Sequence, residues 1–270
     1  MQIVIRHQLS IALGSGSAHA VQQLLLTPSS GPAQTVKSWT IACEGMETGA
    51  RFVDAFGNQC HLVSQTRPEG DLAISVEGTV ETLDRNGVLG RIAGEPVPAL
   101  FRRITPLTRP DIAVYGQFQG VTTGRIALLH ALMGRVGELY GVETEETETT
   151  EAQTGQSQSQ SQGGEPGPVV AAAELAHAFI GAARMLEIPA RFVTGYLLGS
   201  EEAPAAFHAW AEAYSDEIGW IGFDAALGLC PTDHHVRVAI GLDALSAAPV
   251  RSVPNEGEPV VVGLSVTSEA

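Results

Sequence analysis

The first hundred residues alternate apolar and polar positions with the period of two that is typical of half-buried β-strands. Four such segments are QIVIRHQLSIAL, TVKSWTIACEG, QCHLVSQT and LAISVEGTVETL, and Gly, Pro, Asn and Asp residues lie between them. The sequence DAFGN at residues 54–58 separates two apolar runs, which predicts a tight hairpin with Gly or Asn at positive φ. Short strands at this spacing predict an antiparallel β-sandwich. A Pro-rich segment, GEPVPALFRRITPLTRPD, then predicts a domain boundary near residue 105.

Beyond this boundary the period becomes helical. The segment GRIALLHALMGRVGELYG predicts a helix through the apolar positions Ile126, Leu129, Leu132, Met133, Val136 and Tyr140. A second helix has an apolar stripe formed by Leu175, Phe179, Ala183 and Leu186. Four strand-like runs follow: ARFVTGYLLG, AAFHAWAEAYS, GWIGFDAALG and HHVRVAIGLD. This order predicts an α+β domain in which a helix packs on an antiparallel sheet.

A polar segment, ETEETETTEAQTGQSQSQSQGGEPGP, lies between the two helices. It has too little apolar surface to offset the entropy lost on ordering, so we predict a disordered acidic and Gln/Ser-rich insert at 143–168. The predicted organisation is therefore a β-sandwich domain at 1–105 and an α+β core domain at 106–270 that contains this insert.

The composition narrows the possible partners and compartments. The 270 residues are 44% hydrophobic and carry a formal net charge of −15, which argues against nucleic acid and anionic membranes as partners. Cys43, Cys60 and Cys230 are odd in number and far apart, which favours reduced thiols. The N-terminal sequence MQIVIRHQLSIALGSGS is typical of a strand rather than a signal peptide, and no apolar run is long enough to span a membrane. We expect a cytoplasmic protein.

The clearest candidate chemistry lies in the segment FHAWAEAYSDEIGWIGFDAA, which predicts a hairpin with its turn at 215–219. Alternation places His208 on one face of the first strand, with alanines on the other face. Folding the hairpin about its middle puts His208 across from Asp224, with about 5 Å between the Cβ atoms. Such a carboxylate fixes the tautomer of a histidine and stabilises its imidazolium, as in a nucleophile–His–Asp site. The same spacing is also explained if His208 is a structural histidine with a satisfied hydrogen bond and Asp224 is a turn residue.

The nucleophile of such a site is expected at the N-terminus of a helix. There, the helix dipole and the free N–H groups lower the pKa of a thiol and can also form an oxyanion hole. The second predicted helix is placed to do this, but it opens with VAAA at residues 170–173 and has no Cys or Ser in its first turn.

Taken together, MLEIPARFVTGYLLG, HAWAEAY, GWIGFDAALG and HHVRVAIGLDALSAAPVRS resemble the bacterial transglutaminase-like superfamily. The first half, with DAFGN and GEPVPALFRRITPLTRPD, resembles the N-terminal β-sandwich of this family. The resemblance covers nearly the whole chain outside the insert. It implies a papain-like fold with a Cys-His-Asp triad, used by transglutaminases, deamidases or peptidases for acyl transfer through a thioester.

The family's site residues transfer to this chain position by position. His208 corresponds to the histidine of the triad and Asp224 to its aspartate. Counting back without gaps from IPAR puts the cysteine position at Ala172, with Glu174 at an acidic position and His177 at a histidine common in that helix. The resemblance therefore implies a pseudoenzyme that binds a peptide or an amide-bearing group. Several neighbouring residues also depart from the family's turn, which favours natural loss over an engineered Cys replacement.

The alternative is an active amide hydrolase or acyltransferase that uses another nucleophile or activated water. Cys230, in GLCPTDHH, follows Asp224 closely, but it is not at a helix start and is best interpreted as an incidental thiol. A metal site from His208, His234, His235 and Asp224 is conceivable. Because the two neighbouring histidines point to opposite faces of a strand, at most one of them can join it. We expect no metal and no cofactor, and a peptide or an amide-bearing protein as substrate or ligand.

Overall fold

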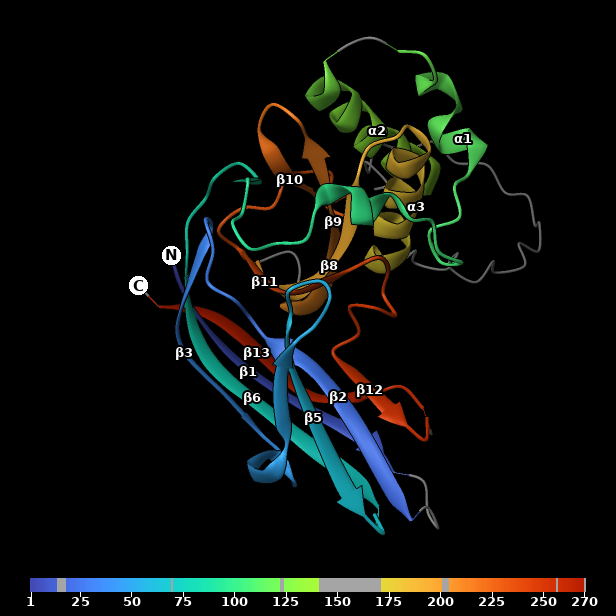
Figure 1. Ribbon diagram of the computed structural model, residues 1–270. Helices are drawn as coiled ribbons and strands as arrows, with labels where there is room; N and C mark the ends of the chain where they lie inside the picture. Colours follow the sequence, from blue (N-terminus) through green and yellow to red (C-terminus); the bar gives the residue numbers. More distant parts are fainter. Residues whose placement is uncertain are drawn as a thin grey trace, which may run out of the picture.

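The computed structural model describes residues 1–13, 18–68, 70–121, 124–140, 171–200, 204–255 and 257–269. Two four-stranded sheets lie at one end of the molecule, and a five-stranded sheet with its helices lies at the other (Figure 1). The predicted α+β class, with an antiparallel sandwich before a papain-like core, is confirmed. The predicted insert at 143–168 lies outside the described residues.

The sandwich consists of two antiparallel sheets. The first has the order β13 (Val260–Glu269), β1 (Gln2–Ala12), β6 (Asp71–Thr82) and β3 (Gln34–Ala42). The second has the order β12 (Val250–Val253), β2 (His19–Thr27), β5 (Gln59–Thr66) and β4 (Ala50–Val53). Every second residue of β1 is buried, as its alternating sequence predicts, and these side chains pack between the sheets.

The hairpin predicted at DAFGN is present between β4 and β5. One carboxylate oxygen of Asp54 accepts hydrogen bonds from the backbone N–H groups of Phe56 and Asn58, each at 2.8 Å. Gly57 has a φ of 91°, which is the left-handed conformation that a glycine adopts without strain. The turn therefore has the chemistry that its sequence predicts.

The strand pairing does not follow a single boundary at residue 105, because some strands on each side of this position pair with strands from the other side. Two strands from the end of the chain, β12 and β13, pair with β2 and β1 of the sandwich. In the other direction, β7 (Val88–Gly90) pairs with β10 (Gly219–Phe223) of the core sheet. Strand edges have unpaired backbone groups, and segments distant in sequence can satisfy them. The spacing of apolar residues along the chain does not encode such pairings.

The core sheet has the order β11 (His235–Gly241), β8 (Ala190–Leu197), β9 (Ala206–Ser215), β10 and β7. Its helices are α1 (Ile112–Tyr115), α2 (Arg125–Tyr140) and α3 (Ala172–Met185), with short 3₁₀ segments η1 (Met46–Thr48), η2 (Pro98–Arg102) and η3 (Gly116–Phe118) elsewhere. The buried alanines of β9, Ala209, Ala211 and Ala213, pack in one cluster with α3. Small side chains on this face of β9 let the helix pack closely, as predicted.

Four charged side chains form a network on the other face of the core sheet, in which Arg191 and Glu212 are buried and Glu95 and Arg237 are partly buried. Arg191 donates to Glu212 at 2.6 Å and to Glu95 at 2.7 Å. Arg237 also contacts both carboxylates, Glu212 at 3.0 Å and Glu95 at 3.1 Å. The Arg191 guanidinium lies 3.8 Å from the ring centroid of Trp220, within cation–π distance. The network fixes the segment around Glu95 to the strands of the core sheet.

Among the described residues, none of the helices combines the length and the apolar composition that crossing a membrane requires.

Candidate functional site

The β9–β10 hairpin brings His208 and Asp224 together. Its pairing runs from Gly219 opposite Ser215 to Phe223 opposite Ala211. Continuing this register, the position opposite Asp224 is Trp210, so the prediction that His208 lies directly across from Asp224 is wrong by one pair of residues.

The cause of this difference is the turn. It is centred at residue 217 rather than at 216, and it closes at Gly219, whose φ is 103°. The carboxylate of Asp224 reaches His208 diagonally, and Oδ2 lies 2.6 Å from Nε2 of the imidazole. The predicted hydrogen-bond contact is therefore present in a different register.

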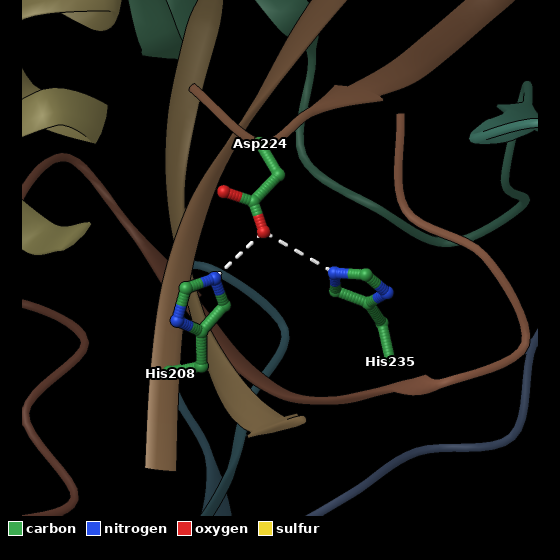
Figure 2. A group of neighbouring side chains, drawn as sticks. All are labelled: His208, Asp224 and His235. Carbon is green, nitrogen blue, oxygen red and sulfur yellow. Dashed lines mark hydrogen bonds and ion pairs between the residues drawn. The ribbon is translucent and has the colours of Figure 1, made fainter. Parts of the chain in front are cut away.

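The Asp224 carboxylate is buried and has a partner on each side. Its Oδ1 accepts hydrogen bonds from the backbone N–H groups of Ala226 at 3.0 Å and Leu227 at 3.2 Å. Its Oδ2 contacts Nε2 of His208 and Nε2 of His235, the second at 3.2 Å (Figure 2). Burial alone would raise the pKa of Asp224, but the hydrogen bonds and charges of the two imidazoles outweigh it and lower the pKa to about 2. The group is thus a carboxylate at ordinary pH.

His235 is the site residue that the sequence does not single out. The sequence predicts that only one of the two neighbouring histidines can face the site, and the structure selects His235, which is buried, while His234 is exposed. The choice depends on the pairing of β11 with β8, in which His235 lies opposite Leu197. A run of two histidines contains no signal for this register.

The two imidazoles and the carboxylate resemble a metal-ligand set. One ligand atom each from His208, Asp224 and His235 lie within 4.8 Å of one another. However, Nδ1 of His235 accepts the backbone N–H of Thr232 at 3.1 Å, so the proton of the neutral ring is on Nε2. A metal on Nε2 would need the opposite tautomer, with two N–H groups facing each other. The residues therefore do not fit a divalent metal.

A cleft of about 610 Å³ opens beside His208. The start of α3 lines it, and so does the segment that includes β12 and the residues after it. Its lining is mainly apolar and includes Ala172, Ala173, Phe192, Phe207, Ala209 and Leu245. Ala172 and His208 thus line the same cleft.

Helix α3 begins at Ala172, after Ala171, which has extended backbone dihedrals and caps the helix without a side-chain hydrogen bond. Glu174 is exposed in the first turn. His177, one turn further, is buried: its Nε2 accepts the N–H of Ala244 at 3.0 Å. Burial lowers the pKa of His177, which favours the neutral ring that can accept this bond. His177 therefore connects α3 to Ala244, a residue that lines the cleft.

None of the three thiols is among the described residues that line the cleft. Desolvation by burial raises the pKa of Cys230. Burial also raises the pKa of Cys43 and Cys60 in the sandwich. A raised pKa keeps a thiol protonated at neutral pH, so these are poor nucleophiles.

Two regions of the chain match known protein families. Residues 167–225 match the family described as the transglutaminase-like superfamily, and this range includes Ala172, His208 and Asp224. Residues 3–81 match the bacterial transglutaminase-like N-terminal region. Each half of the chain therefore contains a region that matches a transglutaminase-like family. The resemblance seen in the sequence is confirmed for both halves of the chain.

A solved structure gives the same fold. It is described as a putative cysteine protease from Cytophaga hutchinsonii, and it matches with a TM-score of 0.62 at 20% sequence identity. The match covers 99% of this chain and 89% of that one. At this identity the likeness establishes the fold. A comparison with curated proteins gives no match.

Proposed function

We propose that this transglutaminase-like protein is a pseudoenzyme that binds peptides or amide-bearing side chains in the cleft and does not catalyse acyl transfer. The observation that carries the proposal is Ala172. It stands at the first position of α3, lines the cleft with His208, and corresponds in the family resemblance to the nucleophilic cysteine. A methyl group has no lone pair with which to attack a carbonyl carbon, so no thioester can form at this position.

The other groups in the cleft support binding rather than covalent chemistry. The hydroxyl groups there are bound to the scaffold: Thr194 donates to the carbonyl of Ala247 at 3.1 Å, and Ser252 accepts from Gln22 at 3.1 Å. Apolar walls with a few polar groups are typical of sites that hold a ligand in a defined orientation. In this proposal, the imidazole of His208 remains as a hydrogen-bonding group for the amide.

The retained His208–Asp224 pair favours a second candidate, an amide hydrolase in which the imidazole activates water. Proton transfer by a positioned histidine contributes about 10²- to 10⁴-fold to a rate. Loss of a covalent nucleophile removes far more, on the order of 10⁶-fold in serine proteases. The activated-water route would leave a slow enzyme at most, so the pseudoenzyme is the better account.

Binding and turnover of a short glutamine-containing peptide separate the two candidates. We expect isothermal titration calorimetry to detect binding to the native protein, and an ammonia assay to detect no release above the buffer. The His208→Ala variant is the control, because it removes the imidazole and leaves the start of α3 intact. Ammonia release by the native protein that is lost in this variant would contradict the pseudoenzyme and support activated water. Absence of binding would contradict both.

A further inference from the structure

The imidazoles of His208 and His235 both contact the same carboxylate oxygen, Oδ2 of Asp224. We infer that His235 is a positioning residue of the site, which holds the Asp224 carboxylate so that His208 is turned toward the cleft. Nε2 of His235 lies 3.2 Å from Asp224 Oδ2, and Nε2 of His208 lies 2.6 Å from the same atom (Figure 2). The assignment of His208 to a ligand-binding cleft rests on the proposed function, whereas the contact of His235 does not.

The backbone before β11 determines which nitrogen of His235 has the proton. The N–H of Thr232 points at Nδ1 of His235 over 3.1 Å. A backbone amide nitrogen can only donate, so Nδ1 accepts and the proton of the neutral ring is on Nε2. That proton faces Asp224. His235 is therefore a hydrogen-bond donor whose direction is set by the turn that precedes the strand.

The donors around Asp224 fix the plane of its carboxylate independently of His208. The N–H groups of Ala226 and Leu227 hold Oδ1, and His235 holds Oδ2. If His235 were absent, Oδ1 would keep its two backbone donors, but Oδ2 would have only His208 as a partner and its direction would be less strictly fixed. With His235 present, the remaining lone pair of Oδ2 is directed at His208 Nε2. The other nitrogen of the His208 ring then points away from Asp224 (Figure 2).

The packing around the two imidazoles allows the hydrogen-bonding role of His235 to be tested separately from its role in filling space. Trp210 contacts both rings: it stacks on His208 at 6.3 Å between centroids and meets His235 edge to face at 5.4 Å. An apolar ring at position 235 would preserve these packing contacts. It would not preserve the donor to Asp224, so substitution can separate the two roles.

The direct test is the tautomer of each histidine, read from ¹⁵N chemical shifts of the full-length protein with labelled histidine. In the native protein we expect His208 and His235 both to have the proton on Nε2. In His235→Phe, which keeps a ring but removes the donor, we expect His208 to populate both tautomers. His235→Gln, which can supply an N–H group, should restore the single tautomer. His234→Ala, a change at the exposed neighbour, should leave His208 unchanged.

Two results would overturn the inference. One is a proton on Nδ1 of His235 in the native protein, which decides the question even if His235→Phe fails to fold. The other is a His208 tautomer that is unaffected in a folded His235→Phe variant.

The reactivity of an introduced thiol gives a second, functional measurement. In Ala172→Cys we expect His235→Phe to slow alkylation by iodoacetamide about tenfold, the lower end of the 10- to 100-fold that hydrogen-bond partners contribute at metal-ligating histidines. His235→Gln should recover part of the rate, and His234→Ala should not change it. If the thiol of Ala172→Cys is itself no more reactive than Cys230, the proposed function fails, while the tautomer measurement still decides the role of His235. If that thiol is reactive and His235→Phe does not slow it, this inference fails alone.

Discussion

Glu212 and Asp224 are two buried carboxylates on the same face of the β9–β10 hairpin, and their partners differ in kind. Glu212 is 1% exposed and is held by Arg191 and Arg237, which are permanently charged. Asp224 is fully buried and is held by two histidines and two backbone N–H groups. Burial would raise the pKa of Glu212, but the charges of the two arginines outweigh it and lower the pKa.

This difference in partners distinguishes a cluster that stabilises the fold, around Glu212, from a candidate functional site, around Asp224. Around Glu212, every charged group has a buried partner of opposite charge, and Glu95 completes the set. Around Asp224, one partner, His208, lines the cleft. In the proposed function, a carboxylate oriented by fixed donors beside an imidazole at a cleft serves a ligand, whereas a closed network of arginines and glutamates stabilises the fold.

The largest effect is expected in the closed network. Glu212→Gln removes the charge that offsets the buried Arg191 and the partly buried Arg237, and we expect the free energy of unfolding to fall by about 3–5 kcal/mol. Urea unfolding followed by circular dichroism measures this loss. A loss below about 1 kcal/mol would show that the network contributes little to holding the fold.

A smaller loss is expected at Asp224. Asp224→Asn keeps the shape of the side chain but removes the charge that accepts from His208 and His235, so we expect a loss of about 2 kcal/mol, the range for hydrogen bonds to charged groups. Thermal unfolding of the variant and the native protein measures it. A loss as large as that of Glu212→Gln would remove the distinction between the two clusters.

The Asp224 carboxylate should also contribute to the way the free energy of unfolding depends on pH under acidic conditions. Its pKa of about 2 in the folded protein lies below the ordinary value of 3.8. A lowered folded-state pKa gives stability that is present above pH 3.8 and is lost as pH falls toward 2, and it amounts to about 2 kcal/mol. Unfolding free energies between pH 5 and pH 2 should therefore fall less steeply in Asp224→Asn. Parallel profiles would contradict this assignment.

The smallest effect is expected for an exposed ion pair. Arg125 and Asp216 are 2.6 Å apart, and the Asp216 side chain is 77% exposed. Water screens such a pair, so Asp216→Asn should change the unfolding free energy by less than about 1 kcal/mol. The same urea measurement serves as the matched control for Glu212→Gln. A comparable loss at both positions would show that burial is not what distinguishes them.

The sequence predicts the parts of this site that depend on local pattern. The alternation in β9 places His208 and Glu212 on one face and the alanines on the other, and this predicts both the contact of His208 with Asp224 and the packing of α3. The parts that it misses depend on pairing between distant segments. The diagonal geometry follows from the centre of a turn, and the choice of His235 follows from the register of β11 against β8.

The same limit applies to the fold. The strands of the sandwich that alternate strongly, such as β1 and β6, are evident in the sequence. In contrast, β7 has only three residues, and β13 starts with three exposed valines, so neither has an alternation that reveals its partner. β12 and β13 pair with sandwich strands that are distant in the sequence, and local periodicity gives no information about such pairing.

The central claim is that Ala172 stands where the family has its nucleophile, and the most direct test is the reactivity of a thiol placed there. In Ala172→Cys, the helix N-terminus and the nearby His208 imidazole should favour the thiolate, so the pKa of the new thiol should lie below that of a free cysteine. Cys230 in the same molecule is the internal control, because burial raises its pKa.

The measurement is the rate of alkylation of each thiol by iodoacetamide at neutral pH, followed by peptide mapping. The account predicts that the thiol at position 172 reacts at least tenfold faster than Cys230, and that adding His208→Ala removes most of this advantage. Equal rates for the two thiols, or a fast rate that does not depend on His208, would contradict it.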